Sequence, residues 1–106
     1  MAKDFRFGMS LRFFKSRERL QEKVKRAEDF GFDVLCVPDH IGAAAPFPTL
    51  TAAAMITTRM RMSMYVLNAA FYKPALLSRD LQALDVLSDG RLEVGLGTGY
   101  VREEFE

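Results

Sequence analysis

Two short segments of this sequence have residue types suited to proton transfer and ligand binding: the pair Asp39-His40 and the glycine run from Gly95 to Gly99. His40 is the only histidine of the chain, and an imidazole can give or take a proton near neutral pH. Asp39 could orient this ring or contact a ligand itself. The alternative is structural, with Asp39 forming a turn and His40 bonding to the loop backbone. A metal site is not predicted, because no second nitrogen or thiolate ligand lies near His40.

The glycine run Gly95-Leu96-Gly97-Thr98-Gly99 follows an apolar stretch. Glycines after a strand allow close approach of the backbone, whose N–H groups can hold phosphate or ring carbonyl oxygens. The run is not a dinucleotide-binding fingerprint, because Tyr100 stands where the third glycine is required. A tight strand-to-helix turn is the alternative interpretation.

The same segment, 92–100, also resembles the first motif of S-adenosylmethionine-dependent methyltransferases, in which an acidic residue and a glycine turn close the first strand. Here three strand–helix units precede it, and few residues follow to supply a second acidic residue. The order of elements therefore disfavours a methyltransferase.

Four short β-type runs recur about 29 residues apart. The first and third alternate in character, the second is continuously apolar as expected for a strand buried on both faces, and the fourth places Leu92, Val94 and Leu96 on one face. The predicted strands are Phe5–Leu11, Val34–Val37, Met62–Leu67 and Leu92–Leu96.

Helical patterns fill the three gaps. The first begins after Ser16 as N-cap and ends at Gly31, with apolar residues Leu20, Val24, Ala27 and Phe30 at helical spacing. The second is predicted from Pro48 to about Thr57, and the third from Pro74 to the turn Ser88-Asp89-Gly90. Strand, helix and strand repeating in this way predict an α/β fold with parallel strands and right-handed crossovers.

A complete (β/α)8 barrel needs roughly 250 residues. The 106 residues of this chain, with four strand–helix units, are therefore predicted to form the N-terminal half of such a TIM barrel, as one partial domain over 1–106. The segment 102–106 looks like the start of a further helix. Because a half-barrel exposes two strand edges, an inactive self-associating fragment is an alternative of a different class.

Composition excludes several other classes. A net charge of +1 gives no basic patch of the kind that binds nucleic acid, and no apolar run approaches the roughly 20 residues of a membrane span. Cys36 is the single cysteine, so neither an internal disulfide nor a cysteine-based metal site is predicted, and its apolar neighbours indicate an inert thiol. The start Met-Ala-Lys-Asp lacks a hydrophobic signal region, from which a cytoplasmic protein is expected.

In parallel α/β folds the functional site forms at the C-terminal ends of the strands. The predicted strands are followed there by polar or glycine-rich loops: Arg12-Phe13-Phe14, Pro38-Asp39-His40, Asn68, and Gly97-Thr98-Gly99-Tyr100.

These residues resemble the luciferase-like monooxygenase family, and within it the branch of coenzyme F420-dependent oxidoreductases. The resemblance covers essentially the whole chain. It is carried by four segments in the right order: Ala27–Asp33, Val37–His40, Lys73–Leu77, and Leu84–Arg91 running into Gly95–Tyr100.

The resemblance implies a barrel whose cofactor ring lies over the C-terminal strand ends, with Asp39 and His40 beside it. It also implies a non-proline cis peptide behind the ring, nearest to Tyr65-Val66, and cofactor contacts from Gly97, Thr98 and Gly99. Asn68, directly after the third predicted strand, is predicted to bind the cofactor as well. The implied activity is hydride transfer between F420 and a small organic substrate, with His40 as proton donor or acceptor; the alternative within the family is an FMN-dependent monooxygenase.

One departure from the family and one expected assembly complete the predictions. The sugar-phosphate dehydrogenases of the family carry a catalytic glutamate directly after Gly-Thr-Gly, whereas this sequence has Tyr100, so that specific activity is not implied. Family members usually dimerise through the second and third helices, and the small residues Ala52–Ala54 would permit close packing there. A homodimer is therefore expected.

Overall fold

A computed structural model describes residues 5–105 of the chain. The predicted domain, 1–106, thus includes five terminal residues that lie outside the described part. The strands are β1 (Gly8–Ser10), β2 (Val34–Val37), β3 (Arg61–Met64), β4 (Leu67–Asn68), β5 (Leu92–Glu93) and β6 (Leu96–Gly97). The helices are α1 (Arg17–Asp29), α2 (Pro46–Ala54) and α3 (Pro74–Leu87), with short 3-10 helices η1 (Ala69–Phe71) and η2 (Arg102–Phe105).

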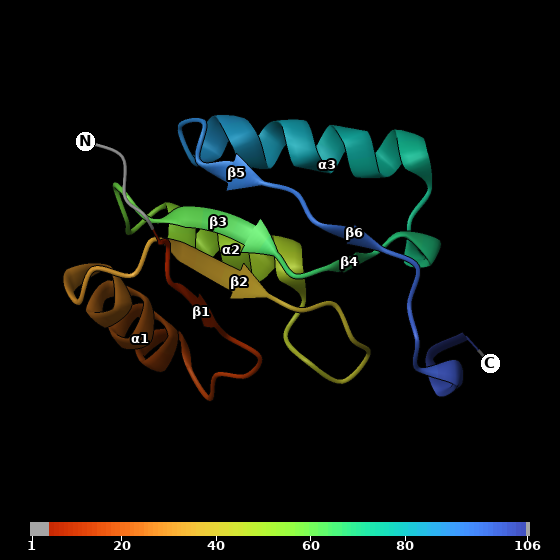
Figure 1. Ribbon diagram of the computed structural model, residues 1–106, viewed down its shortest axis with the longest axis horizontal. Coiled ribbons are helices and arrows are strands. Elements are labelled where there is room, and N and C mark those ends of the chain that lie inside the picture. Colours follow the sequence, from red (N-terminus) through yellow and green to blue (C-terminus); the bar gives the residue numbers. More distant parts are fainter. Residues whose placement is uncertain (1–4, 106) are drawn as a thin grey trace.

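The main sheet is parallel, with strand order β1-β2-β3-β5, and β4 pairs with β6 in a short second sheet (Figure 1). β4 and β6 follow β3 and β5 along the chain, so the two sheets form consecutive parts of the same wall. Within the main sheet the strands pair in the order in which they occur along the chain, β1 with β2, β2 with β3 and β3 with β5, as in a (β/α)8 barrel. A doubly wound sheet instead reverses its order at a switch point. The α/β fold class predicted from the repeats is confirmed.

One register row shows how the sheet is buried. Met9, Leu35, Met62 and Leu92 lie side by side across the four strands, and all belong to the apolar core or pack against it. The helices cover this face, with α2 behind β2 and β3 in Figure 1. Their contribution to the core includes Leu20 and Val24 of α1, Leu50 and Ala53 of α2, and Leu84 of α3.

The next register row faces the other way. Ser10, Cys36, Ser63 and Glu93 are neighbours across the strands, and none of the four is fully buried. Burial raises the pKa of the Cys36 thiol, and Glu93 adds to the rise, so this cysteine is not activated as a nucleophile. It lies on the polar inner face and is half-buried, less enclosed than its apolar sequence neighbours suggested.

An ionic cluster of Arg6, Arg61 and Glu93 lies on that inner face. The carboxylate of Glu93 accepts two hydrogen bonds from the guanidinium of Arg6, at 2.6 and 3.0 Å. Nε of Arg61 lies 2.6 Å from the same carboxylate in an ion pair that lacks the alignment of a hydrogen bond. The hydrogen bond from Arg6 is the main reason that the pKa of Glu93 is lowered.

Each of the four predicted strand regions contains a strand, but the last two are each divided in two, so residues 5–105 form six strands where four were predicted. The strand predicted over Phe5–Leu11 is restricted to Gly8–Ser10, and Phe5 and Phe7 are exposed. The third predicted strand is interrupted at Tyr65-Val66, and the fourth at Val94-Gly95. Leu92, Val94 and Leu96 do not share a buried face: Leu92 packs against the core, whereas Val94 and Leu96 are exposed.

The observed helices begin and end within three residues of the positions predicted from the sequence. The Ser16 hydroxyl accepts a hydrogen bond from the N–H of Arg19, which confirms it as the N-cap of α1, and α3 begins at Pro74 as predicted. Phe30, predicted on the apolar face, is exposed because it caps α1 at the point where the chain leaves the helix. α2 begins at Pro46 and ends at Ala54, two and three residues earlier than predicted, since both of its prolines fit into the first turn. No helix within 5–105 is long and apolar enough to cross a membrane.

Candidate functional site

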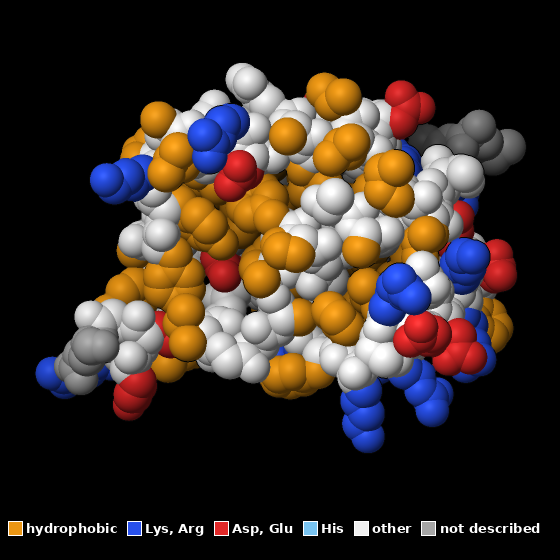
Figure 2. All heavy atoms as spheres, turned by 180° about the vertical axis from the view of Figure 1, so that it is seen from behind, with side chains coloured by type: hydrophobic (Ala, Val, Ile, Leu, Met, Phe, Trp, Pro, Cys, Tyr) orange, Lys and Arg blue, Asp and Glu red, His pale blue; other side chains and the backbone are white. Residues whose placement is uncertain are grey.

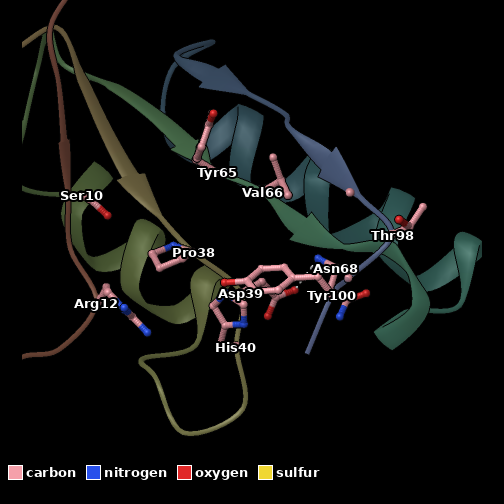
Figure 3. A pocket seen from close by; sticks show the side chains of 12 residues that line it. Ser10, Arg12, Pro38, Asp39, His40, Tyr65, Val66, Asn68, Thr98 and Tyr100 are labelled. Carbon is pink, nitrogen blue, oxygen red and sulfur yellow. Dashed lines mark hydrogen bonds between the residues drawn. The ribbon is translucent and has the colours of Figure 1, made fainter. Parts of the chain in front are cut away.

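A cavity of about 520 Å³ opens at the C-terminal ends of the strands, where the sequence predicts the site (Figure 3). Residues from four separate segments of the chain line it: Ser10, Arg12, Pro38, Asp39, His40, Tyr65, Val66, Asn68, Gly97, Thr98, Gly99 and Tyr100. All eight residues predicted to bind a cofactor are among them. The structure therefore brings the predicted residues together, and their roles toward a cofactor stay predictions.

Asp39 uses its carboxylate within the protein. Oδ2 accepts a hydrogen bond of 2.9 Å from the backbone N–H of Asn68 and another of 2.8 Å from the Tyr72 hydroxyl. The side chain is nearly buried, with 8% of the residue exposed. Burial and the contact with Asp39 together raise the pKa of the Tyr72 phenol, which stays protonated and continues to donate. Asp39 thus ties the loop after β2 to β4 and the turn that follows.

His40 is oriented by a residue that the sequence did not single out. Its Nδ1 lies 3.1 and 3.2 Å from the two carboxylate oxygens of Glu104, in η2, and not against Asp39. One of these oxygens also accepts the backbone N–H of Ile41 at 2.7 Å. The His40 ring is thus bonded to a carboxylate and not, as the structural alternative had it, to the loop backbone. The partner of Nδ1 is Glu104, whereas Oδ2 of Asp39 accepts from Asn68 and Tyr72.

Tyr100 packs against the same imidazole. The two rings meet edge to face, with centroids 5.5 Å apart and planes at 83°. This residue stands directly after the glycine turn, at the position where the sequence departs from the sugar-phosphate dehydrogenases. His40 is therefore flanked by an aromatic ring, from Tyr100, and by a carboxylate, from Glu104.

The peptide bond between Tyr65 and Val66 is cis, at the place that the family resemblance indicates. Tyr65 is mostly exposed, and Val66 points toward the glycine run. A Cβ at Gly95 would lie 2.6 Å from the carbonyl oxygen of Met64, and one at Gly97 would lie 2.5 Å from a methyl group of Val66. Glycine at these two positions therefore allows the segment 95–97 to pack closely against Met64 and Val66.

Asn68 is buried, and its side-chain oxygen accepts the N–H of Ala70, which caps η1. Its amide nitrogen lies 2.7 Å from the position that a Cβ on Gly99 would occupy. Gly99 has a positive φ of 85°, a conformation that L side chains rarely adopt. The glycine turn and the end of β4 are therefore fitted to one another.

Sequence reasoning missed Glu104, Tyr72 and the inward-facing Ser10. The sequence does place acidic residues shortly after the glycine run, but this signal applies equally to Glu103 and Glu104. Of the first loop, Arg12 reaches the cavity, whereas Phe13 and Phe14 line a separate hollow with Lys15, Arg19 and Lys23. Over 5–105 no cluster of three or more histidine, cysteine or acidic residues could hold a metal ion.

The profile of the luciferase-like monooxygenases matches residues 5–106, which is nearly the whole chain. The chain belongs to this family. The match confirms the resemblance drawn from the motifs, and it includes both the Asp39-His40 pair and the glycine turn.

Relatives and solved structures agree with this assignment. The F420-dependent glucose-6-phosphate dehydrogenase of Kribbella flavida is 34% identical over 95 residues, which cover 81% of this chain and 28% of that protein. The coenzyme F420-dependent tetrahydromethanopterin reductase of Methanopyrus kandleri superposes with a TM-score of 0.84 at 28% identity, over 94% of this chain and 28% of the other. The oxygenating component of 3,6-diketocamphane monooxygenase from Pseudomonas putida, solved with FMN, superposes with a TM-score of 0.80 over 92% of this chain and 30% of the other; at 19% identity it supports the fold alone.

The chain spans less than a third of the length of each of these proteins. The four-stranded parallel sheet accordingly corresponds to part of their barrels.

Proposed function

We propose that this chain supplies the cofactor-facing wall of an oxidoreductase that transfers a hydride between coenzyme F420 and a small organic substrate. The observation that carries the proposal is the convergence of His40 and the Gly97–Gly99 turn on one cavity at the strand ends. The F420-dependent relatives, up to 34% identical, support F420 as the cofactor.

The lining residues fit a flat ring system carrying a few polar groups. A volume of about 520 Å³ lies within the usual range of cofactor pockets. Pro38 and Val66 offer apolar surface, and Gly97 and Gly99 line the cavity without side chains of their own. Arg12, exposed at the rim, could pair with an anionic group.

Each residue of the chain has a distinct part in this proposal. Gly97, Thr98 and Gly99 bind the ring through backbone groups, and Tyr65-Val66 support its face. Asp39 shapes the pocket through its bonds to Asn68 and Tyr72. His40 exchanges a proton with the substrate. The bound deazaflavin would supply the site that accepts or gives the hydride.

An FMN-dependent monooxygenase is the second candidate. It is supported by the shared fold of a protein solved with FMN. That support is weaker, because the likeness at 19% identity extends to the fold only, whereas an F420-dependent relative is 34% identical over 95 residues.

Parallel fluorescence titrations of the protein with F420 and with FMN test both candidates. We expect tighter binding of F420, weakened about tenfold or more by His40→Ala. Lys25→Ala, an exposed substitution on α1, is the matched control and should leave the dissociation constant unchanged. Preference for FMN would favour the second candidate. Binding of neither cofactor would contradict the assignment of the cavity.

We also propose that the outer face over α2 and α3 binds a second copy of the chain. Hydrophobic side chains gather on the face seen in Figure 2. The hollow between α2 and α3 is lined mostly by apolar residues, among them Phe47, Ala52 and Leu87, and Val86 of α3 is exposed. α2 contains no charged residue, and Asp80, the charged residue that lines the hollow between α2 and α3, is paired with Arg79. Two copies can therefore meet there without burying an unpaired charge. Sedimentation should find a dimer that Val86→Glu converts to a monomer, and Lys25→Glu should not. A wild-type monomer would contradict this proposal.

A further inference from the structure

Glu104 is enclosed between His40 and the backbone that follows it. Only 7% of its side chain is exposed, although the neighbouring Glu103 in the same 3-10 turn is exposed. One carboxylate oxygen accepts the N–H of Ile41 at 2.7 Å, and both oxygens lie within 3.2 Å of Nδ1 of His40. This contact joins two segments 64 residues apart in the sequence.

The chemistry of the pair fixes where the proton of the imidazole resides. An ionised carboxylate accepts hydrogen bonds and cannot donate them, so the nitrogen facing it must carry hydrogen. In a neutral ring with hydrogen on Nδ1, Nε2 holds the lone pair. Among the described residues Nε2 has no hydrogen-bond partner, and His40 lines the cavity.

The ring is also restrained from its other side. Tyr100 stands edge-on to the imidazole at 5.5 Å, so a flip that exchanged the two nitrogens would have to displace either this contact or the one with Glu104. Glu104 is absent from the lining of the cavity, although it lines an adjoining hollow with His40 and Tyr100. Both of its oxygens are engaged by His40 and the backbone N–H of Ile41, so its route to a ligand in the cavity is through His40.

We propose that Glu104 is the positioning residue of the site: it holds the proton of His40 on Nδ1 and leaves Nε2 to exchange a proton with the substrate. Its catalytic consequence rests on the proposed function. When Nε2 takes a proton, an N–H bond forms, the bond between the donor and that hydrogen breaks, and the donor keeps the electron pair. The imidazolium is then neutralised by Glu104 through the existing Nδ1–H contact.

The single histidine makes a direct test possible, because every imidazole signal of the chain comes from His40. Long-range ¹H–¹⁵N correlation spectra at alkaline pH, where an imidazole is neutral, distinguish the nitrogen that carries hydrogen from the one that does not. We expect wild-type protein to carry hydrogen on Nδ1. Hydrogen on Nε2 in the wild type overturns the proposal without any variant being made.

Glu104→Gln is the informative substitution, since the amide oxygen can still accept the N–H of Ile41 while the negative charge is lost. We expect the two ¹⁵N signals to move toward the pattern of hydrogen on Nε2, and Glu103→Gln, the matched control in the same turn, to leave them unchanged. Unchanged signals in Glu104→Gln would show that the carboxylate does not set the tautomer. Circular dichroism verifies that each variant is folded.

A titration with F420 separates this proposal from the proposed function. Because Glu104 lies outside the cavity lining, Glu104→Gln should change the dissociation constant for F420 less than about threefold, although it alters the ring of His40. A loss of F420 binding of tenfold or more in a folded Glu104→Gln variant would assign the residue to the ligand site and contradict a positioning role. If wild-type protein binds no F420 but shows the expected tautomer, the cofactor assignment fails and the Glu104–His40 relationship stands.

Discussion

Asp39 accepts a hydrogen bond of 2.8 Å from the hydroxyl of Tyr72, 33 residues further along the chain. The same oxygen accepts the N–H of Asn68, so one buried carboxylate joins the loop after β2 to the end of β4. Asp39 and His40, although adjacent in sequence, therefore have different roles in the site. Asp39 maintains the shape of the cavity, and His40 retains a ring nitrogen that can act on a ligand.

Replacing Tyr72 with phenylalanine removes one hydrogen bond to this carboxylate and leaves the ring in place. We expect the free energy of unfolding to fall by about 1–3 kcal/mol, as for the loss of a hydrogen bond to a charged group. Urea denaturation measures the change. Tyr65→Phe, at a residue that is 76% exposed, is the control and should change stability by less than about 0.5 kcal/mol. Equal effects of the two substitutions would show that the Tyr72–Asp39 bond contributes nothing.

Glu28 stabilises the turn that leads into β3. Its carboxylate accepts the backbone N–H groups of Thr58, Arg59 and Met60, the last at 2.8 Å. Glu28→Ala leaves these donors without their acceptor, and we expect a loss of about 2–3 kcal/mol in unfolding free energy. Asp29→Ala, at the exposed neighbouring position, should cost far less. Similar losses for both variants in the same denaturation experiment would contradict this role.

The stability of the protein should fall on acidification through two carboxylates. Burial raises the pKa of Glu28, but the backbone hydrogen bonds from Met60, Arg59 and Thr58 outweigh it and lower the pKa overall. The pKa of Glu93 is also lowered, mainly by its hydrogen bond with Arg6. A carboxyl group with a lowered pKa in the folded state contributes fully above its unfolded value of about 4.5 and loses that contribution as pH falls through the folded value.

Denaturant unfolding between pH 7 and pH 3 checks this expectation. Wild-type stability should be flat above pH 6 and should decline below about pH 5. Glu28→Gln and Glu93→Gln should each be less stable at pH 7 and should each show a shallower decline. A variant that keeps the full wild-type pH dependence would exclude its carboxylate as the source.

Local signals account for the parts of the fold that the sequence predicted. The cap Ser16 and the spacing of Leu20, Val24 and Ala27 define α1 without reference to the rest of the chain. The continuous apolar run of β2 gives its bounds in the same way. Because the strand order follows from short right-handed crossovers, the position of the cavity at the strand ends was also predictable.

The remaining features depend on residues distant in sequence. The contact between Glu104 and His40 leaves no periodic pattern, and a composition argument cannot distinguish Glu104 from Glu103. The interruptions in the third and fourth strands arise where Gly95 passes within contact distance of the carbonyl of Met64, a packing relationship between two strands. Such features need the tertiary structure, since neither partner by itself differs from an ordinary residue of its type.

At Gly99 the backbone has a left-handed conformation, and neighbouring side chains leave no space for a Cβ. It has a φ of 85°, and a Cβ there would lie 2.5 Å from the ring of Phe105 and 2.7 Å from the amide nitrogen of Asn68. Gly90 has a similar φ of 75°, but a Cβ there would meet nothing within 4 Å. The two glycines therefore form a matched pair in which only crowding differs.

Gly90→Ala should cost about 1–2 kcal/mol, the strain of a left-handed conformation for an L residue. Gly99→Ala should cost more, because Asn68 or Phe105 must also move, and it should weaken F420 binding about tenfold or more, whereas Gly90→Ala should leave binding unchanged. Thermal unfolding and fluorescence titration of the two variants measure both effects. In the contrary outcome, Gly99→Ala is destabilised no more than Gly90→Ala and binds F420 as the wild type does. That result would show that the segment 99–105 accommodates a methyl group without cost, and that the close fit of the glycine turn against Asn68 does not shape the cavity.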